Sequence, residues 1–253
     1  MYYSSVKRFF SLLFSLFLVL VLAVSVSAQN ENANIPERNG DYPVPGCPDL
    51  RVRVFVHEPR EKPTVSTTAV CEDGSSNAVV GATGWKLPAG TWKYKINPSS
   101  VPSSVGAANL APITSESFSK WVGAISSSSK PNLVSDGTTS KTRNALDYEN
   151  IITWGRTQGS ALGVTYVWYY TATHLVADVD TIMNKKFPWS LACSTTSYNA
   201  EDILIHELGH WFGLDDEYDA SYVNNTMYGY GSKAEIKKTT LENGDKAGID
   251  TIY

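Results

Sequence analysis

The chain has few histidines and cysteines, and its basic side chains are not concentrated anywhere. Its 253 residues include 21 Lys or Arg, 25 Asp or Glu and four His, which gives a formal net charge of −4 at pH 7. Because no basic stripe is present, a nucleic-acid-binding surface is not expected. Apart from one apolar run at the N-terminus, no stretch could span a bilayer, and no internal repeat is evident. The length suggests one domain of ordinary size with additional segments.

The N-terminal apolar run has the features of a secretory signal peptide. The basic pair Lys7-Arg8 precedes apolar residues 9–24, and Val26-Ser27-Ala28 supplies the small residues of a cleavage site. The run is somewhat shorter than the ~20 residues of a spanning helix, although a membrane anchor is the alternative. We therefore predict a signal peptide over residues 1–28 and a secreted protein. Loss of the two basic residues changes the net charge from −4 to −6.

Residues 29–81 are expected to form an N-terminal extension, and they hold two of the three cysteines. In an oxidising compartment two cysteines pair and one is left over. Cys47 with Cys71 is the preferred pair, because both lie in one small segment without a core of its own. A pairing with Cys193 is the alternative. His57, in the same segment, has no partner in view and is expected at the surface.

Two of the four histidines stand in the stretch His206-Glu207-Leu208-Gly209-His210. Asn199, followed by two acidic residues, is a plausible N-cap, so a helix is expected to begin there. On a helix the two imidazoles lie one turn apart on the same face, where both can reach one cation at roughly 2.0–2.1 Å. Glu207 then lies beside such a cation, which suits a general base for a metal-bound water.

A glycine and an acidic run follow the second histidine. Gly213 can adopt the left-handed conformation, end the helix and turn the chain back toward the metal. Nothing after His210 can supply a third imidazole, so a carboxylate is the natural third ligand. Asp216 is expected in that role, with Asp215 as the near competitor. The alternative is an acidic turn in solvent that binds no metal.

The pattern of residues 206–216, H-E-x-x-H-x-x-G-x-x-D, resembles the zinc signature of the metzincin metallopeptidases. That family also carries a methionine in a tight turn beneath the metal, and Met227 lies shortly downstream, within residues 225–231. Over roughly residues 82–253 the chain looks most like the secreted matrixin-like proteins of microbes. It departs from most metzincins at Asp216, where they have histidine, although some small secreted bacterial members use aspartate.

The resemblance implies an α/β (α+β) fold with a twisted mixed sheet, a long helix, an active-site zinc helix, a methionine turn and a C-terminal helix. It implies Zn²⁺ held by His206, His210 and Asp216, with Glu207 as the general base of peptide hydrolysis. Met227 would support the site without binding the metal.

Three weaker expectations accompany the resemblance. Secreted members often bind calcium, and Asp178 and Asp180 could contribute to a structural Ca²⁺ site; a polar pair facing solvent is the alternative. Matrixin proregions hold a cysteine on the zinc, so Cys47, in a faintly similar motif, is a candidate inhibitor. Tyr228 or Tyr230 could donate to the oxyanion, with ordinary packing as the alternative.

Alternation and spacing predict the order of the elements. Strands are expected at residues 51–56, 92–97, 150–155, 163–170 and 174–184, with helices at 114–127 and within 240–253. Residues 128–147 are expected to be a connection. By resemblance, the strand at 163–170 would be the sheet edge that lines the cleft, where an extended peptide can pair.

The sequence as a whole predicts a secreted zinc-dependent endopeptidase. Its expected parts are a signal peptide at 1–28, an extension or propeptide at 29–81 and a catalytic domain at 82–253. We expect a monomer that takes protein or peptide substrates and binds neither nucleic acid nor, after signal cleavage, membrane. One alternative is a zinc hydrolase with a distant third ligand, Glu235 or Glu242. The other is a non-catalytic secreted binding module, against which the intact Glu207 argues.

Overall fold

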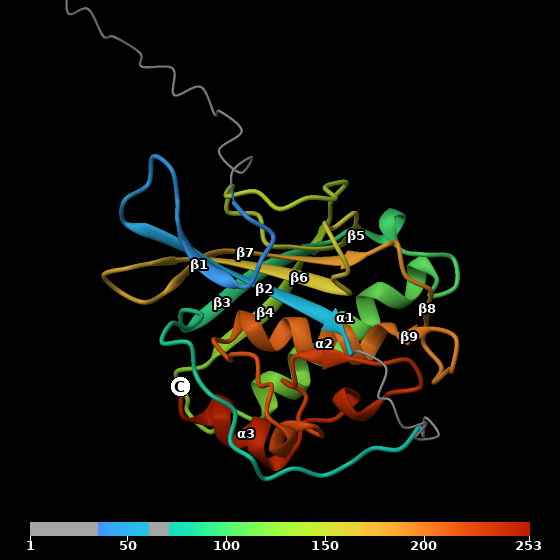
Figure 1. The fold of residues 1–253 in the computed structure, drawn as a ribbon. Coiled ribbons are helices and arrows are strands. Elements are labelled where there is room, and N and C mark those ends of the chain that lie inside the picture. Colours follow the sequence, from blue (N-terminus) through green and yellow to red (C-terminus); the bar gives the residue numbers. More distant parts are fainter. Residues whose placement is uncertain (1–34, 61–70) are drawn as a thin grey trace, which may run out of the picture. The chain divides into compact units, whose positions relative to one another are not determined.

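A mixed β-sheet is the central element of the computed structural model, which describes residues 35–60 and 71–253 (Figure 1). Its strands are β1 (Gly40–Pro43), β2 (Leu50–Pro59), β3 (Gly90–Ile96), β4 (Pro131–Thr138), β5 (Ile151–Gly155), β6 (Gly163–Tyr170), β7 (Val176–Asn184) and β10 (Tyr230–Gly231). Their order is β1-β2-β6-β7-β5-β3-β4, and β10 pairs with β2. β3, β4, β5 and β7 run parallel, whereas β6 runs antiparallel to both β7 and β2.

The helices are α1 (Leu110–Gly123), α2 (Ala200–Trp211) and α3 (Asn243–Asp250). Short 3-10 turns occur at Pro98–Ser100, Ala107–Asn109, Ala220–Tyr222 and Lys237–Thr239. A small separate sheet pairs β8 (Trp189–Ser190) with β9 (Tyr198–Asn199). Within the described residues, no helix is long and apolar enough to cross a membrane. The predicted signal peptide lies outside the described residues.

Helices α1 and α2 lie side by side on one face of the sheet, and α3 lies farther from it (Figure 1). α2 begins where predicted, because the Asn199 side chain accepts hydrogen bonds from the N–H groups of Glu201 and Asp202, at 2.9 and 3.0 Å. Glu201 is the one residue of this helix that is not buried. The Trp121 indole of α1 donates to the Ile205 carbonyl at 2.9 Å, which joins the two helices. The predicted metzincin-like α/β architecture is confirmed.

Two expectations about the sheet are wrong. β4 lies inside the predicted connection 128–147; its mostly polar, exposed residues gave no alternation to detect. The strand at 163–170 is not an edge, because β2 pairs along its whole length. β1 and β2, which lie within the expected extension at residues 29–81, form strands of the main sheet.

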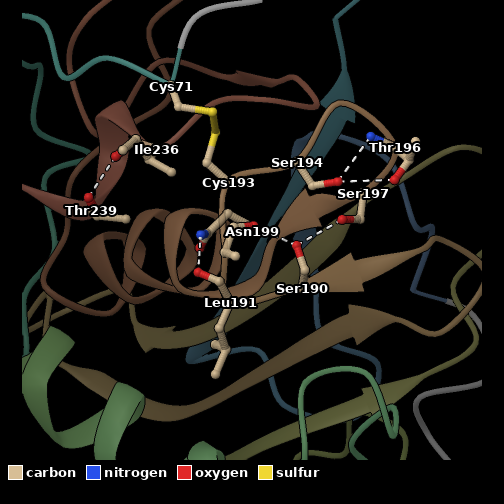
Figure 2. Close-up of a disulfide and its surroundings, with 11 residues drawn as sticks. Cys71, Ser190, Leu191, Cys193, Ser194, Thr196, Ser197, Asn199, Ile236 and Thr239 are labelled. Atoms are coloured by element: carbon tan, nitrogen blue, oxygen red, sulfur yellow. Dashed lines mark hydrogen bonds between the residues drawn. A yellow bond between two sulfur atoms is a disulfide. The ribbon is translucent and has the colours of Figure 1, made fainter.

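The disulfide joins Cys71 to Cys193, with an S–S distance of 1.98 Å, so the expected Cys47–Cys71 pair is wrong (Figure 2). Cys47 is a free, partly buried thiol between β1 and β2. The two bonded residues are 122 positions apart, and only the fold brings them together. The loop around Cys193 is further fixed where the Asn199 amide donates to the Leu191 carbonyl, at 2.7 Å. The disulfide therefore ties residue 71 to the loop that leads into α2.

Candidate active site

Helix α2 places His206 and His210 on one face, both fully buried. The Nδ1 of His206 is 2.8 Å from the Thr226 carbonyl oxygen, and the Nδ1 of His210 is 3.0 Å from that of Leu214. Since a carbonyl oxygen only accepts, each Nδ1 carries the proton and each Nε2 presents a lone pair. Burial lowers the pKa of His206 to about 4, which favours this neutral form. Both imidazoles are thus oriented as metal ligands are.

The turn after α2 brings Asp216 to the two imidazoles. Gly213 has a φ of 98°, and a Cβ there would lie 2.1 Å from the Trp85 carbonyl oxygen, so no other residue fits. Asp216 Oδ1 is 3.1 Å from His206 Nε2 and 3.5 Å from His210 Nε2.

Asp215, the competing ligand, points elsewhere. Its Oδ1 accepts from the Arg53 guanidinium at 3.1 Å and from the Asp216 N–H at 3.0 Å. The structure therefore brings Asp216, and not Asp215, to the two histidines.

The three facing atoms fit a metal ion. His206 Nε2, His210 Nε2 and Asp216 Oδ1 are buried without a hydrogen-bond partner, and their lone pairs repel one another unless a cation lies between them. Ligand atoms about 2.0–2.1 Å from a tetrahedral zinc lie about 3.3 Å apart. The two distances above, 3.1 and 3.5 Å, bracket this value. A two-histidine, one-carboxylate set of this kind leaves one zinc position open.

Glu207 is held beside these atoms by a chain of hydroxyl groups. Its Oε2 accepts from the Thr165 hydroxyl at 2.6 Å, and the Thr165 and Thr181 hydroxyl oxygens are 2.8 Å apart. The Trp211 indole donates to Thr181 at 2.9 Å, which orients the chain toward the carboxylate. The other oxygen, Oε1, has no partner, and a Cβ at Gly163 would lie 2.5 Å from it. Burial raises the pKa of Glu207 to about 7, and a neighbouring cation would lower it.

The turn with Met227 supports the two histidines from below. A Cβ at Gly209, between them in the sequence, would lie 2.3 Å from the Met227 sulfur and 2.8 Å from the Trp121 ring. The N–H groups of Thr226 and Met227 donate to the buried Asp245 carboxylate, at 3.0 and 3.3 Å. Helix α3 therefore fixes the backbone of Thr226 and Met227, and the Thr226 carbonyl orients His206.

Sequence reasoning missed the contacts of three residues. Thr165 stood in a predicted strand with nothing to mark its hydroxyl. The Tyr218 hydroxyl donates to Asp216 Oδ2 at 3.1 Å, a contact across a loop with no pattern in the sequence. His57, expected at the surface, is 1% exposed. Its Nδ1 is 3.7 Å from Glu207 Oε1, and its ring centroid is 3.9 Å from that of His206.

The distant glutamates are not near the histidines. Glu235 Oε1 is 3.5 Å from the Lys237 ammonium and 3.4 Å from that of Lys238. Glu242 caps α3 and accepts from the Ser76 N–H at 3.0 Å. Neither belongs to a potential metal group within the described residues. The alternative with a distant glutamate ligand is therefore wrong.

Asp178 and Asp180 are buried, so the alternative of a polar pair facing solvent is wrong. Asp178 Oδ2 accepts from the N–H groups of Asp147 and Tyr148, each at 2.8 Å. Asp180 likewise accepts from the backbone of residues 145 and 151. The pair fixes this loop to β7, and within the described residues it does not form a metal-ligand group.

Cys47, a weaker candidate, lies away from the metal ligands. Cys47 precedes Leu50, and an extended strand at about 3.3 Å per residue puts Leu50 roughly 23 Å from His57. Cys47 is accordingly absent from the metal groups of the described residues. Tyr228 packs against Tyr230, with ring centroids 5.7 Å apart, and beneath the Arg60 guanidinium at 4.9 Å.

The chain matches the model of a known protein family over part of its length. Residues 137–253, which include β5 to β7, α2 and the turn with Met227, match the family described as matrixin, a peptidase family. No curated protein matches the chain. Over residues 137–253 the family match confirms the resemblance to matrixins and supports a matrixin-like metallopeptidase of the metzincin kind. Matrixins bind zinc, and the described residues include a cluster that could hold such an ion.

Proposed function

We propose that this matrixin-like protein is a secreted zinc-dependent endopeptidase, with His206, His210 and Asp216 as metal ligands and Glu207 as the general base. The observation that supports the proposal most is a set of three buried ligand atoms without hydrogen-bond partners, in which Asp216 Oδ1 is 3.1 Å from His206 Nε2 and 3.5 Å from His210 Nε2. An unpaired carboxylate oxygen stands next to them. Metal ligands and a free carboxylate side by side, in a chain that matches a peptidase family, favour hydrolysis over binding alone.

The residues divide the chemistry between them. Zinc bound at this site supplies a Lewis acid and a water whose pKa lies near ~7. Thr165 fixes Oε2 of Glu207, so the free Oε1 is the oxygen that takes a proton from water. The same oxygen then delivers that proton to the leaving amine of the substrate. Thr226 and Leu214 keep the histidine Nδ1 atoms protonated and the Nε2 atoms available.

Zinc retention tests the ligand assignment. Asp216→Ala is expected to lose zinc on dialysis, Asp216→His to recover part of it, and Asp215→Ala to behave as the wild type. The last substitution removes a partly exposed ion pair with Arg53, worth at most about 1 kcal/mol. Loss of the metal from Asp215→Ala, together with its retention in Asp216→Ala, would show that the ligand is one residue earlier.

Casein hydrolysis with and without phenanthroline separates a peptidase from a non-catalytic binding module. The purified protein is expected to carry about one zinc and to lose its activity in the chelator. A zinc-loaded protein without activity in any processed form would favour the binding module.

N-terminal sequencing of protein from the medium tests secretion, and the sequence is expected to begin after residue 28. A chain that keeps residue 1 and stays with membranes would contradict secretion.

A further inference from the structure

The ring of Tyr228, immediately after the methionine of the turn, is surrounded by positive charge. The Arg60 guanidinium lies 4.9 Å from the ring centroid, and the ammonium groups of Lys237 and Lys238 lie 5.6 and 5.4 Å from it. Arg60 follows strand β2, whereas both lysines belong to a 3-10 turn near the C-terminus. Two segments far apart in the sequence therefore bring three cations to one aromatic ring.

The carboxylates near these cations supply too little negative charge to balance them. Glu235 Oε1 is 3.5 Å from Lys237 Nζ and 3.4 Å from Lys238 Nζ, so one oxygen serves two ammonium groups at long range. Asp202 accepts from the Lys238 N–H at 2.7 Å, but burial raises its pKa to about 7. Three cations, less one charge for Glu235 and at most one for Asp202, leave a net charge between +1 and +2.

Much of this positive charge is buried. The side chain of Lys238 is 0% exposed, and that of Lys237 is 12% exposed. Nη2 of Arg60 is buried too, and it has no hydrogen-bond partner among the described residues. A buried charged donor without a partner is unfavourable, because it has lost water and gained nothing in return. An anion bound to Arg60 and Lys237 would supply the missing partner.

Arg60 and Lys237 form the accessible side of the cluster, since the Arg60 side chain is partly exposed. Burial, together with the charges of Lys238 and Arg60, lowers the pKa of Lys237 to about 8, so this lysine still carries its proton at pH 7. A planar guanidinium beside an ammonium group offers the charge-assisted hydrogen bonds that carboxylates accept. A carboxylate also carries the single negative charge that brings the cluster closest to neutrality.

The cluster adjoins the proposed metal site. The Thr226 hydroxyl is 3.4 Å from the Lys238 carbonyl oxygen, and the Thr226 carbonyl accepts from the His206 ring. Asp202 lies one turn before His206 on α2. A ligand held by Arg60 and Lys237 would therefore lie beside the turn that orients this histidine.

We propose that Arg60 and Lys237, beside the ring of Tyr228, bind a carboxylate group. An acidic side chain or chain end of a peptide presents this chemistry, and so does a small free carboxylate. In the first case the assignment rests on the proposed function, and it makes the protein selective for peptides with an acidic residue.

Thermal unfolding of the zinc-loaded full-length protein in sodium acetate tests the site. A Kd of about 10 mM is the order expected for a carboxylate held by one or two charge-assisted hydrogen bonds. Relative to sodium chloride, about 100 mM acetate should then raise the Tm by about 3–6 °C more in the wild type than in Lys237→Gln. Arg60→Gln is a second variant with the same expected result.

Lys233→Gln is the matched control for these variants. Lys233 also lies over a tyrosine ring, that of Tyr198 at 5.8 Å, but it is exposed and has no second cation beside it on that ring among the described residues. This variant should keep the full gain in Tm. The absence of a gain in the wild type, or an equal gain in Lys237→Gln and Arg60→Gln, would overturn the carboxylate site.

Two neutral-ended peptides that differ only in one aspartate or asparagine distinguish the sources of the carboxylate. They are titrated into zinc-loaded Glu207→Gln protein, in which cleavage is expected to be slow. If the ligand is a substrate side chain, the aspartate peptide should bind at least ~10-fold tighter, and adding Lys237→Gln should abolish the difference. Equal affinities together with the gain in acetate would identify a small free carboxylate as the ligand.

The acetate experiment does not depend on peptide hydrolysis. A protein that cleaves casein but shows no acetate effect would contradict the carboxylate site alone. A protein that shows the effect in zinc-loaded form but cleaves no casein would contradict the proposed function alone.

Discussion

Replacing Gly209 by alanine tests the packing on which the two histidines rest. The new Cβ would lie 2.3 Å from the Met227 sulfur and 2.8 Å from Trp121 Cζ2, and both side chains are fully buried. Non-bonded atoms prefer separations of about 3.5–4.0 Å, so the sulfur has to move by about 1.2 Å or more. Overpacking of this kind costs ~1–3 kcal/mol. Alanine favours a helix interior over glycine by about 1 kcal/mol.

The packing conflict outweighs the helix preference, because neither neighbour has free space. We expect Gly209→Ala to lower the free energy of unfolding by about 1 kcal/mol, which is ~2 kcal/mol of overpacking less about 1 kcal/mol of helix preference. Movement of Met227 also shifts the Thr226 carbonyl that orients His206, so zinc affinity should fall about 10- to 100-fold.

The measurements are urea unfolding followed by tryptophan fluorescence, with zinc and with chelator, and a zinc competition titration. Gly123→Ala is the matched control, because a Cβ on that glycine of α1 meets nothing within 4 Å. It should leave stability unchanged or raise it by up to about 1 kcal/mol. If Gly209→Ala proves as stable as Gly123→Ala and binds zinc equally well, the close packing described here is wrong.

Three other substitutions test the site and the fold. Glu207→Gln should keep zinc and lower turnover at least ~10²-fold; equal turnover would exclude this residue as the base. Tyr218→Phe removes the hydrogen bond to Asp216 and should weaken zinc binding about 10- to 100-fold; unchanged affinity would show that the contact does not matter. Burial raises the pKa of Asp178 above its unfolded value, so the free energy of unfolding falls as pH rises from about 4 through the raised pKa. In Asp178→Asn the free energy of unfolding, measured as a function of pH, should fall less steeply over this range. A steeper fall would refute the argument.

Local signals made much of the fold and the metal-binding helix predictable. The polar cap at Asn199, the histidine spacing and the glycine at 213 each act within a few residues, and α2 and its turn follow them. The strand at 163–170 was also placed correctly, because its apolar run is bounded by turn residues. Such features need no knowledge of the rest of the chain.

The remaining features depend on pairings between distant residues. His57 was expected in solvent because its burial arises from β2 pairing with β6, more than 100 positions later in the sequence. Cys71 meets Cys193 across 122 residues for a similar reason. Thr165 contacts Glu207 only because the sheet and α2 pack face to face. Register and packing of this kind leave no mark in a single sequence.

Anomalous diffraction at the zinc absorption edge, from crystals of protein purified with zinc, tests the central claim most directly. The account predicts one strong peak about 2.0–2.1 Å from His206 Nε2, His210 Nε2 and Asp216 Oδ1. A peak bound through Asp215 or Glu235 instead, or no peak at the two histidines, would contradict it.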